Sequence, residues 1–199
     1  MRPLLIRAAA GIVLVGVIAT VIWAVKVYNK LVTLEQSANE MAAEIQNGYQ
    51  RRADLIPNLV GTVKGYATQE RDVLESVTRA RAGAAGVQWR PEAVDDPKAL
   101  AAFQAAQDRL SAALGRLLVT VERYPQLKSN TNFMALQKEL AKTEDRIARD
   151  RSLYNRAVRA YKIRLGLFPG SIVGRLAGYK PKSYFAGSGG TAEPPDVKF

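Results

Sequence analysis

The sequence contains no cysteine and no histidine among its 199 residues. Without cysteine there are no disulfides and no thiolate metal sites. Without histidine the chain lacks the usual general base near neutral pH and the commonest metal ligand. It also lacks the glycine motifs of phosphate loops, dinucleotide sites and serine hydrolases, and no Asp-x-Asp loop has the spacing of a carboxylate metal site. We therefore predict no catalytic residue, no metal, no cofactor and no enzymatic activity.

Acidic residues are in the minority. The chain has 29 lysines and arginines against 18 aspartates and glutamates, a net charge of +11. A basic protein binds phosphate, either in nucleic acid or on an anionic lipid surface. The stretch from Arg146 to Lys182 holds ten basic residues and one acidic residue. The location of this stretch in the fold decides between the two partners.

One long apolar run lies near the N-terminus. Ala8 to Val25 carries no charge, and as a helix it is roughly 27 Å long, close to the ~30 Å hydrocarbon core of a bilayer. Trp23 and Tyr28 are typical interfacial anchors at its end. We predict that residues 1–27 form a membrane anchor with a single span. A cleaved signal peptide is the alternative, although the run is long for one.

The charges that flank the span predict its orientation. Arg2, Arg7 and the α-amino group precede it, whereas Lys26 and Lys30 follow it and are succeeded by acidic residues up to Glu44. The positive-inside rule then favours a cytoplasmic N-terminus and an extracytoplasmic bulk of the chain. We expect a bacterial inner (plasma) membrane protein, and a cytoplasmic bulk is the alternative.

Apolar residues at helical spacing follow the span in four seams, at 27–45, 56–77, 100–124 and 133–168. No alternating strand pattern and no internal repeat is present. The predicted fold is all-α: the N-terminal transmembrane helix continues into an antiparallel four-helix bundle with long helices over residues 28–168. Association of the long helices between chains is the alternative.

Two sites combine an acidic residue with a nearby proline. In "RRADLIPNLV" (51–60), Asp54 can cap a helix whose first turn contains Pro57, which predicts a helix start or a sharp kink. Asp96 before Pro97 repeats this signal for the third helix. Residues 83–96 are predicted to be a loop, and "QLKSNTN" (126–132) a polar turn.

Several segments between residues 28 and 185 resemble the LemA family of bacterial membrane proteins. The matching segments are "YNKLVTLEQ" (28–36), "RRADLIPNLVGTVKGYATQE" (51–70), "VTRARA" (77–82), "RYPQLKSNTNFMALQKEL" (123–140), "TEDRIARDRSLYN" (143–155) and "LFPGSIVGRLAGYKPKSYF" (167–185). The resemblance implies one N-terminal anchor and a mostly antiparallel helical bundle. It implies no enzymatic activity.

Nine polar residues lie at predicted helix ends, on the apolar seams or beside them. They form either a structural polar cluster that fixes helix register or a partner site. We keep both interpretations for Arg52, Asp54, Asn58, Glu70, Arg81, Arg123, Arg151, Tyr154 and Asn155.

The basic C-terminal part is predicted to return to the bilayer. Up-and-down connectivity brings residues 169–186 back to the membrane as a basic amphipathic segment. We expect contact with anionic lipid through Arg175, Lys180, Lys182, Tyr184 and Phe185. A solvated basic face is the alternative, and nucleic acid is not expected because the charge is tethered at the membrane. Residues 187–199 are predicted to be disordered.

These features together predict a non-enzymatic, membrane-anchored helical scaffold or adaptor of the bacterial envelope. Its expected partners are the bilayer, a second copy of the chain and a membrane protein. The alternative function is a regulatory partner of a membrane enzyme such as a protease or a transporter.

Overall fold

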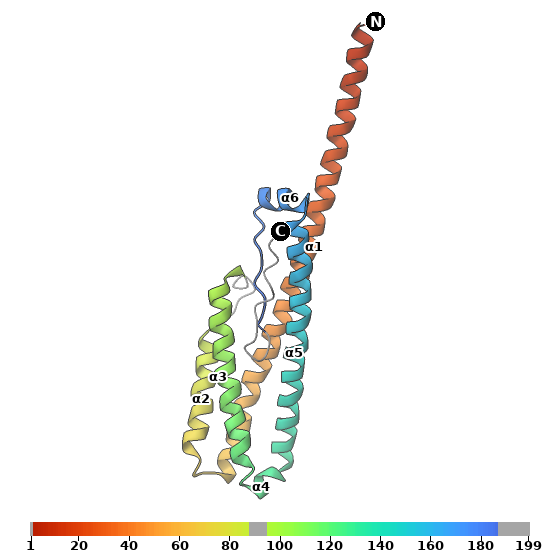
Figure 1. Ribbon diagram of the computed structural model, residues 1–199. Helices are drawn as coiled ribbons and strands as arrows, with labels where there is room; N and C mark the ends of the chain where they lie inside the picture. The colour runs from red at the N-terminus through yellow and green to blue at the C-terminus, as the bar shows by residue number, and fades with distance from the viewer. Residues whose placement is uncertain (1, 88–94, 187–199) are drawn as a thin grey trace. The chain divides into compact units, whose positions relative to one another are not determined.

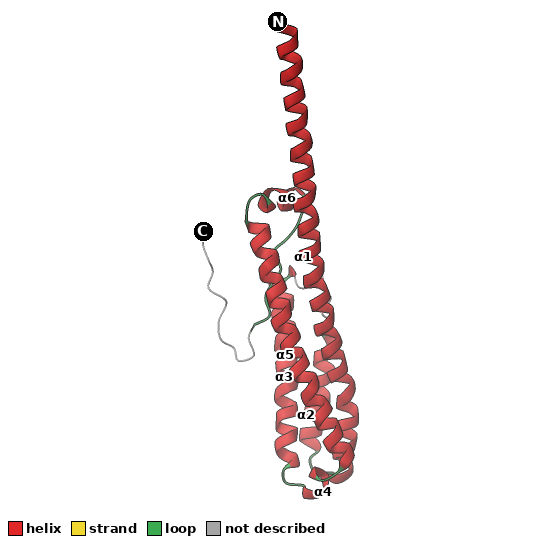
Figure 2. Ribbon diagram, turned by 90° about the vertical axis from the view of Figure 1, so that its right-hand side faces the viewer, coloured by secondary structure: helices red, strands yellow, loops and turns green. Residues whose placement is uncertain are grey.

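The computed structural model describes residues 2–87 and 95–186, with side chains from residue 10 onward. All secondary structure in these residues is helical, in agreement with the all-α prediction (Figure 1, Figure 2). The helices are α1 (Arg2–Tyr66), α2 (Arg71–Gly86), α3 (Pro97–Val121), α4 (Pro125–Lys128), α5 (Thr131–Gly166) and α6 (Gly170–Leu176). The predicted disordered tail, 187–199, lies outside the described residues, as do residues 88–94 of the predicted loop at 83–96. The loop prediction is wrong for residues 83–86, which form the end of α2.

The first helix is unusually long, with 65 residues. Its N-terminal part is apolar and exposed, and it is long and apolar enough to cross a membrane. The predicted continuation of the span into the first seam is confirmed, because α1 runs through both without interruption.

The helix start predicted at Asp54 and Pro57 is wrong, whereas the sharp kink given as its alternative stays a prediction. Both residues lie inside α1, which ends only at Tyr66, and Asp54 accepts a hydrogen bond from Gln50 Nε2 at 2.9 Å within the helix. Proline has no N–H, so the carbonyl of Ala53, four residues earlier, loses its helical donor. The Nε of Arg81 on α2 donates to this carbonyl oxygen at 2.7 Å. The helix therefore continues because a neighbouring helix supplies the missing donor.

The chain divides into two compact units, which we describe separately. The anchor unit comprises Met1–Ala38 and Ala157–Pro181, and the core unit comprises Asn39–Arg156 and Lys182–Phe199. Both α1 and α5 contribute to each unit, and α6 belongs to the anchor unit.

One buried apolar cluster runs through the core unit, with residues from α1, α2, α3, α4 and α5. Contacts between α1 and α5 run in opposite directions along the chain, as Arg51 pairs with Glu139 and Glu44 pairs with Arg146. Gly48 permits their close approach, because a Cβ there would lie 2.8 Å from Cγ1 of Ile147. On the other side of the cluster α2 and α3 lie side by side (Figure 1).

The starts of α3 and α4 can be compared with the predictions made from the local sequence. The predicted cap of α3 is confirmed: Asp96 accepts a hydrogen bond from the backbone N–H of Lys98 at 2.8 Å, with Pro97 in the first turn. The predicted polar turn at 126–132 instead contains the short helix α4, whose Leu127 is fully buried. Burial of this leucine gives the turn an apolar contact that the polar composition did not indicate.

In the anchor unit, α6 packs against α1 and the end of α5. A Cβ on Gly174 would lie 2.3 Å from Cδ1 of Leu165 and 3.7 Å from Cδ1 of Leu31, so the absence of a side chain lets α6 approach both helices. The fourth predicted helix, expected to reach residue 168, ends at Gly166 and is followed by α6.

Candidate functional site

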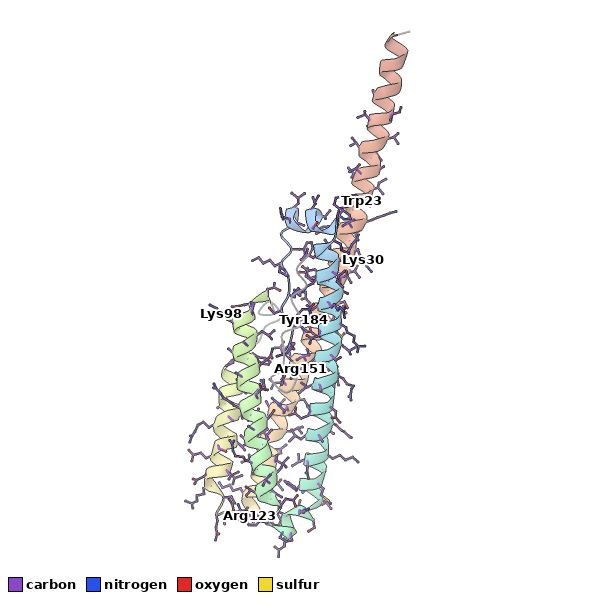
Figure 3. The ribbon with its side chains drawn as sticks, in the orientation of Figure 1. Trp23, Lys30, Lys98, Arg123, Arg151 and Tyr184 are labelled. Atoms are coloured by element: carbon purple, nitrogen blue, oxygen red, sulfur yellow. The ribbon has the colours of Figure 1, made fainter. Side chains whose placement is uncertain are left out.

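The anchor unit exposes apolar side chains around α6. Exposed fractions are 55% for Leu167, 70% for Phe168, 53% for Ile172 and 84% for Leu176. We call these four residues the α6 face. The ring of Phe168 lies 5.8 Å from that of Trp23, and Figure 3 shows Trp23 on α1 where α6 meets it. The α6 face therefore lies at the level where the apolar span ends.

A shallow apolar groove separates α6 from α1. It is lined by Val21, Ala24, Val25, Tyr28, Val173, Leu176 and Ala177. Beside it the rings of Tyr28 and Tyr179 are 6.0 Å apart. Burial, followed by a hydrogen bond with Tyr28, raises the pKa of Tyr179 to about 12. The Tyr179 hydroxyl is therefore protonated at physiological pH, and the two rings extend the apolar surface with polar tips, as is typical of interfacial tyrosines.

The five residues predicted to contact the membrane surface do not lie together. Arg175 and Lys180 are exposed in the anchor unit, as that prediction requires. The prediction is wrong for Lys182 and Phe185, which are 5% and 2% exposed in the core unit. Tyr184, between them, is half-buried. Composition made these residues look amphipathic, but each buried one has a specific partner.

Residues 182–186 form an extended segment, here called the strap, that lies against α3 and α5. Side chains of these helices bind its backbone. Asn155 donates from Nδ2 to the Phe185 carbonyl and accepts from the Phe185 N–H, each at 2.9 Å. Tyr154 donates to the Ser183 carbonyl at 2.8 Å. The strap thus obtains from side chains the pairing that a strand would obtain from a neighbouring strand.

The next strap residue is held in the same way. The N–H of Ala186 donates to Oε1 of Gln104 at 3.1 Å, and Arg151 donates from Nη2 to the Ala186 carbonyl. Figure 3 shows Arg151 on α5 and Tyr184 on the strap. The strap's backbone groups are therefore bound by residues of two different helices.

Two strap side chains are bound as well. The Phe185 ring packs edge-on against Tyr154 at 5.3 Å, and the Arg151 guanidinium lies 5.4 Å from the Phe185 ring centre. Lys182 Nζ lies 3.2 Å from Oδ1 of Asp95. Burial raises the pKa of Tyr154, and the charge of Asp95 adds to this shift. Its hydroxyl therefore stays protonated and remains a donor to the strap.

Arg52 forms a second polar centre in the core unit. Its side chain is 2% exposed and lies on α1. Nη1 donates to Glu144 Oε1 at 2.7 Å and to Ser111 Oγ at 3.0 Å, and Nη2 donates to Gln107. The guanidinium also lies 5.0 Å from the ring centre of Tyr49. Its partners lie on α3 and α5, so hydrogen bonds of Arg52 connect three helices.

The remaining predicted polar residues lie apart from these two centres. Glu70 accepts hydrogen bonds from Arg123 at 3.0 Å and from the Tyr124 hydroxyl at 2.8 Å, which joins the start of α2 to the end of α3. Asn58 and Asp54 are exposed on α1. Four of the nine residues, Arg52, Glu70, Arg81 and Arg123, thus make contacts between helices. Three others, Arg151, Tyr154 and Asn155, bind the strap.

The two strap-binding residues on or before α3, Asp95 and Gln104, were missed from the sequence. No local pattern marks them, since their partners lie more than eighty residues later in the chain. In the part of the chain that the structure describes, no group of three acidic, histidine or cysteine residues could hold a metal ion. The side chains that bind the strap are amides (Asn155 and Gln104), a phenol (Tyr154) and a cation (Arg151).

The family model that describes the LemA family matches residues 41–199. The chain belongs to the LemA family. The match covers the whole core unit except its first two residues, including the strap and its binding residues.

Three relatives are named as magnetosome proteins. Magnetosome protein MamQ 2 and Magnetosome protein MamQ 1 of Paramagnetospirillum magneticum are each 26% identical over 196 residues, which is 90% of this chain and 72% of each relative. Magnetosome protein MamQ of Magnetospirillum gryphiswaldense is 27% identical over 174 residues, which is 79% of this chain and 64% of the relative. Family and fold together indicate a membrane-associated protein.

Proposed function

We propose that this LemA-family protein is a non-enzymatic membrane scaffold, with a span that anchors it and an α6 face that inserts into the bilayer interface. The observation that carries the proposal is the α6 face itself: four large apolar side chains exposed beside Trp23. Large apolar side chains exposed together on a short stretch of chain mark an interaction site with a membrane or a protein. Its position at the end of the span favours lipid.

The charge beside the α6 face fits an anionic membrane. Arg175 and Lys180 are exposed, and each cation at such a surface contributes about 1 kcal/mol of attraction. The span and the α6 face would then hold the anchor unit by two contacts. The core unit carries the remaining chain, and we infer that its four long helical segments form an antiparallel four-helix bundle.

The absence of cysteine allows a direct test in the full-length chain. An environment-sensitive fluorophore on Leu176→Cys, in vesicles containing anionic lipid, should show blue-shifted emission and quenching by spin-labelled lipid. The matched control is Val119→Cys on α3, a position that is 72% exposed in the core unit. It should remain in water and escape quenching. Equal quenching of both probes, or of neither, would overturn the interfacial placement.

The proposed attraction between the two cations and anionic lipid can be tested separately. Replacing Arg175 and Lys180 by glutamine should make the Leu176 probe shallower in anionic vesicles, by the loss of about 1 kcal/mol per cation. In neutral vesicles the same replacement should have no effect. Added salt should reproduce the replacement in anionic vesicles, because screening lengths are about 10 Å at 0.1 M.

We propose that the protein resides in the bacterial inner membrane with its bulk outside the cytoplasm. The support is a margin of about one positive charge: Arg2, Arg7 and the α-amino group precede the span, and Lys26 and Lys30 follow it. In intact cells, a membrane-impermeant maleimide should label Val119→Cys. Labelling only after lysis would assign the bulk to the cytoplasm.

The scaffold function predicts self-association in native membranes. Crosslinking followed by affinity purification should recover copies of the chain. Recovery of one stoichiometric membrane enzyme without self-association would instead support a regulatory partner.

A further inference from the structure

The strap occupies a binding site that recognises an extended peptide mainly through its backbone. Asn155 pairs with both polar backbone groups of Phe185. Tyr154, Gln104 and Arg151 bind backbone groups of the flanking strap residues. In the contacts described above, Lys182 and Phe185 are the only strap residues whose side chains are bound. This is the pattern of a groove that holds an added extended segment.

Nothing in these contacts depends on the strap belonging to the same chain. The partners named above lie on α3, on α5 or at Asp95, and the strap follows Pro181, the last residue of the anchor unit. The strap of a second copy has the same sequence and would make the same contacts. Exchange of an identical segment costs little, because it preserves each interaction.

Membrane anchoring favours such exchange. The span confines all copies to one surface and one orientation, which raises the concentration of one strap near the strap-binding residues of another. We propose that the strap-binding residues of α3 and α5 receive the strap of a second copy, so that exchanged straps link copies within the scaffold. This inference deepens the self-association of the proposed function and rests on it.

The contact between Ala186 and Gln104 gives a direct test in the full-length chain. One population carries Gln104→Cys and a differently tagged population carries Ala186→Cys, and both are reconstituted in the same vesicles. Neither chain can form this disulfide alone. Oxidation should therefore yield a covalent dimer bearing both tags. The collision control pairs Ala186→Cys with Val119→Cys, which is exposed on the same helix α3.

Two variants test whether formation of the disulfide-linked dimer depends on binding of the strap. Asn155→Ala, placed only in the Gln104→Cys chain, removes two hydrogen bonds from that site while the site of the Ala186→Cys chain stays intact. The yield of the dimer should then fall about tenfold. Asn58→Ala, an exposed asparagine on α1, should leave it unchanged. A yield no higher than that of the collision control, or equal yields in both asparagine variants, would overturn the exchange. Capture of a foreign protein by Gln104→Cys in native membranes, without the tagged dimer, would also overturn it.

A locked strap separates this inference from the scaffold function. A chain that carries both Gln104→Cys and Ala186→Cys can be oxidised within itself at low density. If exchange links the copies, the locked chain should lose self-association and regain it on reduction. If the locked chain self-associates as well as the reduced chain, the scaffold stands and the strap exchange is wrong.

Discussion

Two consecutive stretches of the chain mix basic, aromatic and aliphatic residues in similar ways. One contains α6 and extends to Pro181, and the other is the strap. The first exposes its apolar and charged side chains, with Leu176 at 84%. The second buries them, with Phe185 at 2% and Lys182 at 5%.

The difference follows from how each stretch satisfies its backbone. As a helix, α6 makes most of its own hydrogen bonds, so its side chains are free to face outward. The strap has no regular partner strand and must obtain hydrogen bonds from α3 and α5, which draws its side chains into the core unit. Backbone satisfaction, rather than composition, decides which stretch can contact a membrane.

The largest expected difference between the two stretches is the loss of unfolding free energy when a phenylalanine in or beside each is replaced by alanine. Phe185→Ala should lower the free energy of unfolding by about 3 kcal/mol, because it empties a buried ring site against Tyr154. Phe168→Ala should change it by less than about 0.5 kcal/mol, since the ring is exposed. Denaturant unfolding of the full-length protein in detergent, followed by circular dichroism, measures both. Equal losses would mean that the strap is not a structural part of the core unit.

Removing the amide that clamps the strap should have the next largest effect. Asn155→Ala leaves the Phe185 N–H and carbonyl without partners, which should cost about 2 kcal/mol. The amide hydrogen of Phe185 should then exchange faster with solvent. Asn58→Ala should leave the exchange rate at Phe185 as it is. Unchanged protection in Asn155→Ala would show that the strap is held by its side chains alone.

Local sequence signals predicted the apolar seams well. Val27, Leu31 and Ile45 were placed on one face of the first helix, and all three are buried. The cap at Asp96 was predicted for the same reason, because a cap depends on residues within one helical turn. Such features need no knowledge of the rest of the chain.

Signals that depend on distant partners could not be predicted. Pro57 looks like a helix start until Arg81, on another helix, is seen to replace the missing donor. Lys182 looks like a lipid contact until Asp95 is found beside it. In each case the deciding partner lies elsewhere in the sequence and is brought close only by the fold.

The pair of Pro57 and Arg81 extends the comparison to α1, where a side chain again supplies a hydrogen bond that the backbone lacks. Arg81→Met should cost about 1–2 kcal/mol by leaving the Ala53 carbonyl unpaired. In the Pro57→Ala background the new N–H can bond this carbonyl, so the same change should cost about 1 kcal/mol less. Thermal or denaturant unfolding of the four chains gives this coupling. Additive losses, within about 0.3 kcal/mol, would show that Arg81 acts independently of the proline.

The smallest expected effect concerns the pH dependence of strap binding. Burial raises the pKa of Tyr154 above the ordinary value of about 10. A raised pKa means that the unfolded chain loses this proton more readily than the folded chain. The contribution of Tyr154 to stability is therefore complete below about pH 10 and falls as the pH rises further.

Tyr154→Phe removes the hydroxyl that donates to the Ser183 carbonyl at 2.8 Å, which should cost about 1 kcal/mol of unfolding free energy at neutral pH. It should also make the alkaline fall in stability shallower than in the unmodified chain. Unfolding free energies measured from pH 7 to 11 test both effects, and parallel curves for the two chains would show that Tyr154 does not ionise with unfolding.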